Sequence, residues 1–116
     1  MKNLLVIKKT SQLNSVLTSH GYGLKKVLLE WQDSDSNITQ VAVGFLEEGC
    51  SIDKHIHPDM EEFYFILKGS VSFEVENQNY SLEKDDFIKI PAGAEHSLNA
   101  LKNTEMIYWG CQFSDK

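Results

Sequence analysis

Short runs of strand-forming residues recur along almost the whole chain, and this recurrence constrains the fold more than any other feature. Turn-forming clusters separate the runs, for example at residues 33–37 and 91–93. Many short strands joined by regular turns predict an all-β sandwich or barrel. The expected strands span residues 4–8, 26–31, 38–46, 55–57, 63–67, 71–76, 87–90 and 106–113.

One segment near the N-terminus has helical rather than strand periodicity. Residues 11–18 place Leu13 and Leu17 four positions apart, behind a hydroxyl-bearing residue that can cap a helix. A chain of 116 residues is long enough for one hydrophobic core, and it shows no repeat and no linker. The sequence therefore predicts a single all-β domain over residues 1–116, with at most one short N-terminal helix.

Two histidines separated by one residue carry the clearest chemical signal. His55 and His57 lie in a strand-like region, where alternate side chains leave the same face. Both imidazoles are therefore expected to point the same way, close enough to share one ion. A carboxylate follows in the next strand-like run, and His96 follows a Pro-Ala-Gly turn able to aim it inward. Imidazole and carboxylate are ligands of borderline divalent metals, so the sequence predicts a metal site.

The residues alone leave the identity of the carboxylate open. Glu61 and Glu62 are adjacent, and the run at residues 63–67 is apolar on both faces, so periodicity does not say which glutamate faces the histidines. The fourth histidine, His20, lies in a glycine-containing turn and is interpreted as an ordinary loop residue. Three imidazoles and one carboxylate leave positions open on a six-coordinate ion, which suits ligand binding better than a closed structural site.

The spacing of these residues resembles the two motifs of the cupin family. The first motif is Gly, five residues, His-x-His, four residues, Glu, six residues, Gly, and it matches Gly49, His55, His57, Glu62 and Gly69. The second is Gly, five residues, Pro-x-Gly, two residues, His, three residues, Asn, and it matches Pro91, Gly93 and His96. It departs at two positions: Asp85 replaces the glycine, and Ala100 replaces the asparagine, with Asn99 one position early. The resemblance implies a cupin-type double-stranded β-helix, a jelly-roll barrel, with its metal motifs within residues 49–100.

The resemblance also implies a ligand set and a cofactor. The family spacing selects Glu62 over Glu61 as the carboxylate ligand. The implied metal ligands are then His55, His57, Glu62 and His96. One divalent ion is expected, either Mn, Fe, Ni, Co or Zn, and availability rather than affinity decides among them in the cell. Tyr64 and Tyr108 are candidate catalytic residues, as a general acid or as groups that orient a ligand hydroxyl. The alternative for each tyrosine is that it only fills a small barrel.

Composition and charge exclude some classes of ligand and partner. A formal charge of -6 at pH 7 argues against nucleic acid, which is bound through cationic side chains. All eleven basic residues are lysine. Because arginine is the usual bidentate partner of carboxylate and phosphate, its absence favours a neutral polyol, sugar or aromatic ligand over a dianion.

No apolar run is long enough for a membrane span and no signal peptide is recognisable, so the cytoplasm is the expected location. Cys50 and Cys111 are interpreted as unpaired residues.

Two classes of function fit these features. The first is a small metalloenzyme acting on a small metabolite, and the cupin resemblance implies an isomerase, epimerase, decarboxylase or dioxygenase. The second is a binding module, a sensor or carrier that holds a small molecule at the metal without turnover. A purely structural metal is the least favoured alternative, because the ligand set leaves coordination positions open.

A homodimer is expected from the two ends of the chain. Residues 4–7 are too apolar to lie on an open sheet edge without inviting pairing, and residues 106–113 are apolar on both faces. The alternative is that residues 4–7 pack against their own barrel, with the helix at 11–18 covering the edge.

Overall fold

The computed structural model describes residues 4–18 and 23–116, and nearly all of its regular structure is β-strand. His20 lies outside these residues. The strands are β1 (Val16–Leu17), β2 (Leu24–Leu29), β3 (Ile38–Leu46), β4 (Ser51–His55), β5 (Met60–Lys68), β6 (Ser70–Val75), β7 (Gln78–Glu83), β8 (Phe87–Ile90), β9 (His96–Ala100) and β10 (Thr104–Gln112). Two three-residue 3-10 helices, η1 (Thr10–Gln12) and η2 (Trp31–Asp33), flank β1 and β2. Neither helix, nor any other in the described ranges, is long and apolar enough to cross a membrane.

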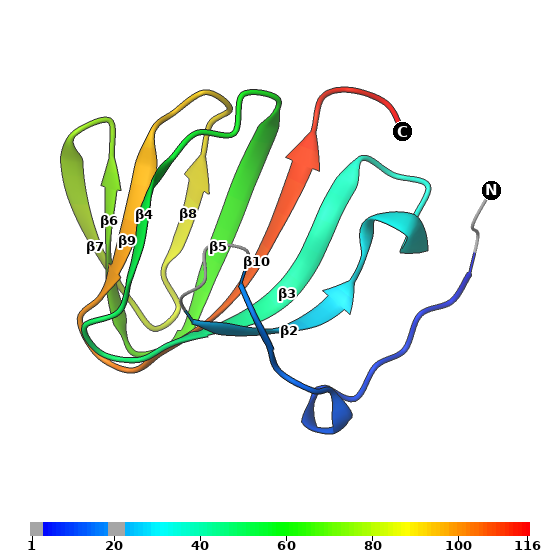
Figure 1. The fold of residues 1–116 in the computed structure, drawn as a ribbon, viewed down its shortest axis with the longest axis horizontal. Helices are drawn as coiled ribbons and strands as arrows, with labels where there is room; N and C mark the ends of the chain where they lie inside the picture. The colour runs from blue at the N-terminus through cyan, green and yellow to red at the C-terminus, as the bar shows by residue number, and fades with distance from the viewer. Residues whose placement is uncertain (1–3, 19–22) are drawn as a thin grey trace.

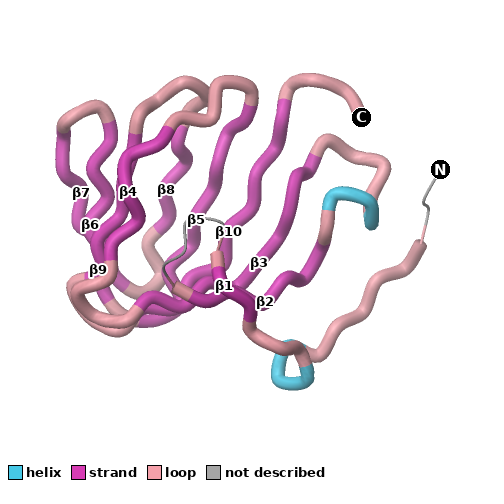
Figure 2. Tube along the Cα trace, in the orientation of Figure 1, coloured by secondary structure: helices cyan, strands magenta, loops and turns pink. Residues whose placement is uncertain are grey.

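The strands form two antiparallel sheets that lie against each other (Figure 1). One sheet has six strands in the order β1-β2-β3-β10-β5-β8, and the other has four in the order β4-β9-β6-β7. The last strand, β10, is therefore inserted between β3 and β5, and Figure 2 shows how little of the described chain is helical. The predicted fold class, an all-β jelly roll, is confirmed.

The hydrophobic core fills the space between the two sheets. In β6, Val71 and Phe73 face inward and are fully buried, while the residues between them are partly exposed. The opposing sheet contributes Ile66, also fully buried, and Tyr64, whose ring centroid lies 5.0 Å from that of Phe73. Burial of each such side chain stabilises the fold by about 1.5–3 kcal/mol.

Most of the predicted strands within the barrel lie close to their expected positions. The predictions for β3 and β8 have the observed bounds, and those for β2, β5, β6 and β10 differ by a few residues. The strand expected at 55–57 is shifted, since β4 ends at His55. The turn residues at 76–79 predict a hairpin that returns through Tyr80 and Leu82, and β7 pairs with β6 in this way. No strand was predicted at β1 or β9. β9 mixes polar with apolar residues, so it carries no strong apolar signal.

Two predictions for the N-terminal arm, residues 4–18, are wrong. Residues 4–8 form no strand, and residues 11–18 form no α-helix but the end of η1 followed by the short strand β1. So short a helix is marginal in water unless one face packs on a core, and Leu17 is 66% exposed. The arm is joined to the barrel by the pairing of β1 with β2, but its first residues leave their apolar side chains in solvent, with Leu5 87% exposed. Residues 4–7 therefore do not bury their apolar side chains against the barrel as the alternative supposed.

Candidate metal centre

Strand pairing in the four-stranded sheet brings His55 and His96 together. β4 and β9 pair antiparallel with His55 directly opposite His96, after a register shift that follows Ile52. Residues directly opposite each other share one face of a sheet. Their ring centroids lie 4.2 Å apart. The same-face arrangement of these two histidines follows from the register of β9.

His57 joins them from the connection after β4, not from a strand. Its carbonyl oxygen accepts a hydrogen bond from the backbone N of Gly93 at 2.9 Å, which ties it to the turn before β9. Gly93 has a φ of 83°, a conformation that glycine adopts at little cost. The His57 ring centroid lies 4.9 Å from that of His55. The two imidazoles do lie close together, but a loop anchored by the second motif places His57, and strand alternation does not.

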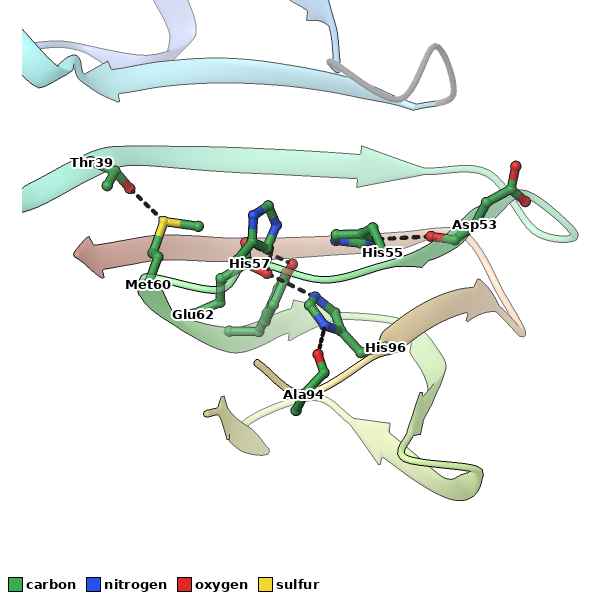
Figure 3. A network of polar contacts seen from close by, with 9 residues as sticks. Thr39, Asp53, His55, His57, Met60, Glu62, Ala94 and His96 are labelled. Carbon is green, nitrogen blue, oxygen red and sulfur yellow. Dashed lines mark hydrogen bonds and ion pairs between the residues drawn. The ribbon is translucent and has the colours of Figure 1, made fainter. Parts of the chain in front are cut away.

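Glu62 reaches the histidines from the other sheet (Figure 3). It lies on β5, and its Oε1 is 2.8 Å from Nε2 of His96 and 3.4 Å from Nε2 of His57. Glu61 forms an ion pair instead, with 3.2 Å between its Oε2 and Nζ of Lys89. The structure therefore groups Glu62, and not Glu61, with the three histidines.

The donor atoms of this group fit a metal ion. One donor atom from each of His55, His57, Glu62 and His96 lies within 4.8 Å of the others. Donors about 2.1 Å from one ion and at right angles to each other would lie about 3 Å apart, close to the two contacts of Glu62. The Nδ1 atoms of His55 and His96 lie 2.8 and 2.9 Å from the carbonyl oxygens of Asp53 and Ala94. Because a carbonyl only accepts, each Nδ1 carries the proton, and Nε2 is the nitrogen that could bind a metal. The group is positioned to bind a metal ion.

The charges of Glu62 and His96 stabilise each other. Burial alone would raise the pKa of Glu62, but the hydrogen bond from His96 and the charges on His57 and His96 outweigh it and lower that pKa from its ordinary value of 4.5. Burial alone would lower the pKa of His96, but its hydrogen bond to Glu62, with the one to Ala94, raises that pKa above 6.5. The carboxylate is therefore ionised at neutral pH, as a metal ligand must be.

Tyr64 and Tyr108, the two candidate catalytic residues, lie beside this group. Their rings stack with centroids 5.5 Å apart, and the Tyr64 hydroxyl donates to Oε2 of Glu62 at 3.4 Å. Burial, followed by the charge of Glu62, raises the pKa of Tyr64 well above 10 and the pKa of Tyr108 to about 12. Both phenols keep their protons at neutral pH, so they can donate a hydrogen bond or a proton but cannot act as bases.

A cavity of about 390 Å³ opens between the sheets at this group, and we call it the central cavity. It is lined by Thr18, Leu24, Lys25, Thr39, Gln40, Gly44, Phe45, Leu46, Ile52, His57, Met60, Glu62, Tyr64, Leu98, Met106, Tyr108, Trp109 and Gly110. Two polar contacts in its wall were not predicted. Thr39 Oγ1 donates to Sδ of Met60 at 3.3 Å, and Lys25 Nζ donates to Oε1 of Gln40 at 3.1 Å. Each pair joins different strands, so no local sequence pattern marks it.

Comparison with known proteins identifies the family. The family model described as the cupin domain matches residues 43–109, which is more than half of the chain and includes all four donor residues. This chain belongs to the cupin family. A comparison with curated proteins gave no match. The family and the two-sheet architecture together confirm the resemblance seen in the motifs.

Several solved structures have a similar fold, and three of them illustrate the likeness. A predicted oxalate decarboxylase from Thermotoga maritima aligns with a TM-score of 0.85 at 20% identity, covering 95% of this chain and 100% of its own. KdgF from a Halomonas species aligns with a TM-score of 0.79 at 14% identity, covering 98% and 97%. An RmlC-like cupin from Shewanella frigidimarina aligns with a TM-score of 0.78 at 12% identity, covering 97% and 95%. At these identities the likeness shows the fold alone.

Proposed function

We propose that this cupin holds one divalent ion, Mn, Fe, Ni, Co or Zn, at His55, His57, Glu62 and His96 and acts on a small molecule in the central cavity. The observation that carries the proposal is the convergence of four donors, two of which, His57 and Glu62, line the central cavity. Its volume, about 390 Å³, falls in the range of roughly 300–1,000 Å³ typical of small-molecule sites.

The residues around the ion suit the binding of an oxygen-bearing ligand. A divalent ion at this position would polarise an oxygen atom of the ligand. Tyr64 and Tyr108 are both neutral phenols. The Tyr64 hydroxyl donates to Glu62, so Tyr108 is the phenol that can donate a hydrogen bond to a ligand oxygen. Leu98 and Met106, both buried, keep water away from the ligand and so strengthen these interactions.

The reaction classes that fit are isomerisation, epimerisation, decarboxylation and oxygenation of a small metabolite in the cytoplasm. The Thermotoga neighbour, a predicted oxalate decarboxylase, supports decarboxylation as one of these classes. The absence of arginine from the sequence favours a polyol, sugar or aromatic compound over a dianion.

A binding module without turnover is the second candidate. One observation favours it: Glu62 is the only carboxylate among the described residues that line the central cavity, and it belongs to the metal-binding group. Both tyrosines are protonated, so a reaction that needs a separate base would find no second carboxylate and no deprotonated tyrosine in that lining. A sensor or carrier needs no such base.

Elemental analysis of purified variants tests the metal site. His57→Ala and Glu62→Ala should each lose most of the bound metal, because each removes one donor from the group. Glu61→Ala is the matched control, since its carboxylate pairs with Lys89; His20→Ala is a second control. Equal metal content in Glu61→Ala and Glu62→Ala would overturn the ligand assignment.

Turnover separates the enzyme from the binding module. The metal-loaded protein would be assayed for dioxygen uptake and for product formation with polyols, sugars and aromatic compounds. The enzyme proposal expects turnover that falls at least tenfold in Tyr108→Phe while metal content stays unchanged. A compound that binds but is never converted would favour the sensor or carrier.

We also propose that the chain forms a homodimer. The apolar arm is exposed, with Leu4 and Ile7 at 70% and 76%. On the six-stranded sheet, Phe63 and Trp109 stack with centroids 5.4 Å apart, and neighbouring Phe87 is 52% exposed. Such apolar surface is typical of an association site. Light scattering should give twice the 13.2 kDa of one chain, and a monomer mass that persists at high micromolar concentration would contradict the dimer.

A further inference from the structure

Lys25 places a positive charge in the wall of the central cavity. It lies on β2 opposite Gly44 of β3, and both residues line the cavity. The next residue, Lys26, leaves the opposite face of the strand, and its Nζ donates to the carbonyl oxygen of Thr10 at 3.0 Å. Among the described lysines, Lys25 alone lines this cavity.

An uncharged partner orients the Lys25 ammonium group. Its Nζ donates to Oε1 of Gln40 at 3.1 Å, in a partly buried position. An ammonium group has three N–H donors. No carboxylate in the described parts of the chain forms an ion pair with Lys25, whereas the surface residue Lys54 pairs with Glu74 at 2.9 Å. With a neutral amide as its partner, the Lys25 side chain has further N–H donors for a ligand in the cavity.

The Lys25 side chain reaches toward the end of the sheet that carries Glu62. Its backbone lies opposite Gly44, four residues further along β3, and its Nζ is brought to Gln40 by the 3.1 Å hydrogen bond. Gln40 belongs to the irregular stretch of β3 that faces Gly110 of β10, and Gly110 lies opposite Glu62 of β5. Adjacent strands are about 4.8 Å apart, so the backbones at Gln40 and Glu62 are separated by roughly 10 Å. Between them the wall is formed by Gly110 and by Tyr108. One small molecule can therefore contact the Lys25 ammonium and the metal-binding group together.

We propose that Lys25, positioned by Gln40, binds the carboxylate of a small organic monoanion whose hydroxyl- or carbonyl-bearing end lies at the metal-binding group. The inference rests on the proposed function, because it names the ligand class of the same cavity. Lysine supplies one point charge and not the bidentate fork that arginine offers, so charge matching selects a single carboxylate. The preference for uncharged compounds drawn from composition is thereby refined to an oxygen-rich or aromatic body with one anionic group.

Isothermal titration calorimetry on the metal-loaded full chain tests this inference. The probes are lactate, gluconate and benzoate, each compared with an uncharged counterpart: lactamide, sorbitol and benzamide. We expect at least one carboxylate to bind about 10-fold to 100-fold more tightly than its counterpart, the range for one charge-assisted hydrogen bond. Lys25→Met should abolish the preference, and the matched control Lys26→Met should keep it.

Gln40→Glu provides a second variant that retains the lysine. The new carboxylate would pair with Lys25 inside the cavity, so the carboxylate preference should disappear although the ammonium group remains. This variant decides the question if Lys25→Met fails to fold, which thermal unfolding would show. A preference that persists in either folded variant would overturn the inference.

Elemental analysis of the same samples distinguishes the failure of this inference from that of the proposed function. Wild-type protein that holds metal but prefers no carboxylate would overturn the Lys25 inference and leave the metal site standing. Protein that holds no metal would overturn the proposed function, and with it the inference that depends on it. Tighter binding of glycerol 1-phosphate than of every carboxylate would also overturn the inference, since it would identify a site for dianions.

Discussion

Gly69→Ala should destabilise the fold much more than Gly49→Ala, although both glycines belong to the first cupin motif, which begins at Gly49 and ends at Gly69. Both have positive φ angles, 93° and 86°, which cost a non-glycine residue roughly 1–2 kcal/mol. A Cβ at Gly49 would meet no atom within 4 Å, so only that conformational cost applies. A Cβ at Gly69 would lie 2.2 Å from the carbonyl oxygen of Asn103 and 2.7 Å from Oγ1 of Thr104.

The groups that crowd Gly69 cannot move away cheaply. Thr104 is 3% exposed, and its Oγ1 accepts a hydrogen bond from the backbone N of Ser70 at 3.2 Å. Overpacking of this kind costs about 1–3 kcal/mol more. Gly69→Ala should therefore lower the free energy of unfolding by roughly 2–5 kcal/mol, and Gly49→Ala by only about 1–2 kcal/mol. At about 4 °C per kcal/mol for a chain of this length, the melting temperatures should fall by roughly 8–20 °C and 4–8 °C.

Urea and thermal unfolding in the presence of a chelator would measure both variants without a contribution from metal. Gly93→Ala is a third variant with a positive φ of 83° and no atom near the added Cβ, so it should behave like Gly49→Ala. Equal losses at Gly69 and Gly49 would refute the reasoning, because they would show that the β5–β6 turn relaxes freely around the new methyl group.

Three further predictions concern the metal and the second motif. Between about pH 5 and 8, the free energy of unfolding should fall with rising pH in chelator-treated, metal-free protein and should rise in metal-loaded protein. Parallel curves for the two samples would contradict this. Glu62 raises the pKa of His96 above 6.5, so their charged pair stabilises the metal-free fold below pH 6.5, and this stability is lost as pH rises through the raised pKa. Metal binding needs neutral imidazoles, so the stability that metal contributes increases as pH rises. At a hundredfold excess of free metal over the Kd, the fold should gain about 2.7 kcal/mol, and a melting temperature that ignores prolonged chelation would rule this out. Asp85→Gly should leave stability unchanged or raise it by up to about 1 kcal/mol, because Asp85 holds a φ of 72° where the motif has glycine; a clear loss in urea unfolding would show that its side chain is needed.

The sequence predicted correctly those strands in which the pattern of apolar residues is itself sufficient to identify a strand. β3 and β8 are apolar or alternate clearly, and their bounds were predicted correctly. The polar strand β9 was missed, although its register with β4 places His96 opposite His55. The N-terminal arm was predicted wrongly because its apolar spacing is a local property, and whether a face is buried depends on the rest of the fold. The insertion of β10 between β3 and β5 is a property of topology that periodicity does not contain.

That these four donor residues lie together could be predicted from spacing, but the reasons for their positions could not. Strand alternation suggested that His57 shares a face with His55, yet the hydrogen bond to Gly93 is what holds His57. The departure at Asp85 does not disturb the fold, because aspartate adopts the left-handed conformation that the turn requires. The pairing of Lys25 with Gln40 depends on how β2 and β3 are aligned, and neither residue belongs to a motif.

The division of the donor group between two sheets has a consequence for how it binds metal. His55 and His96 belong to the four-stranded sheet and Glu62 to the six-stranded sheet, so their separation is fixed by the core packed between the sheets. Tyr64, next but one to Glu62, packs against Phe73 of the opposite sheet and so ties the two sheets together beside the site. The core already holds the four donor atoms within 4.8 Å of one another, so little conformational entropy is lost when an ion binds. Metal affinity should therefore depend on the packing of the core as well as on the four donors.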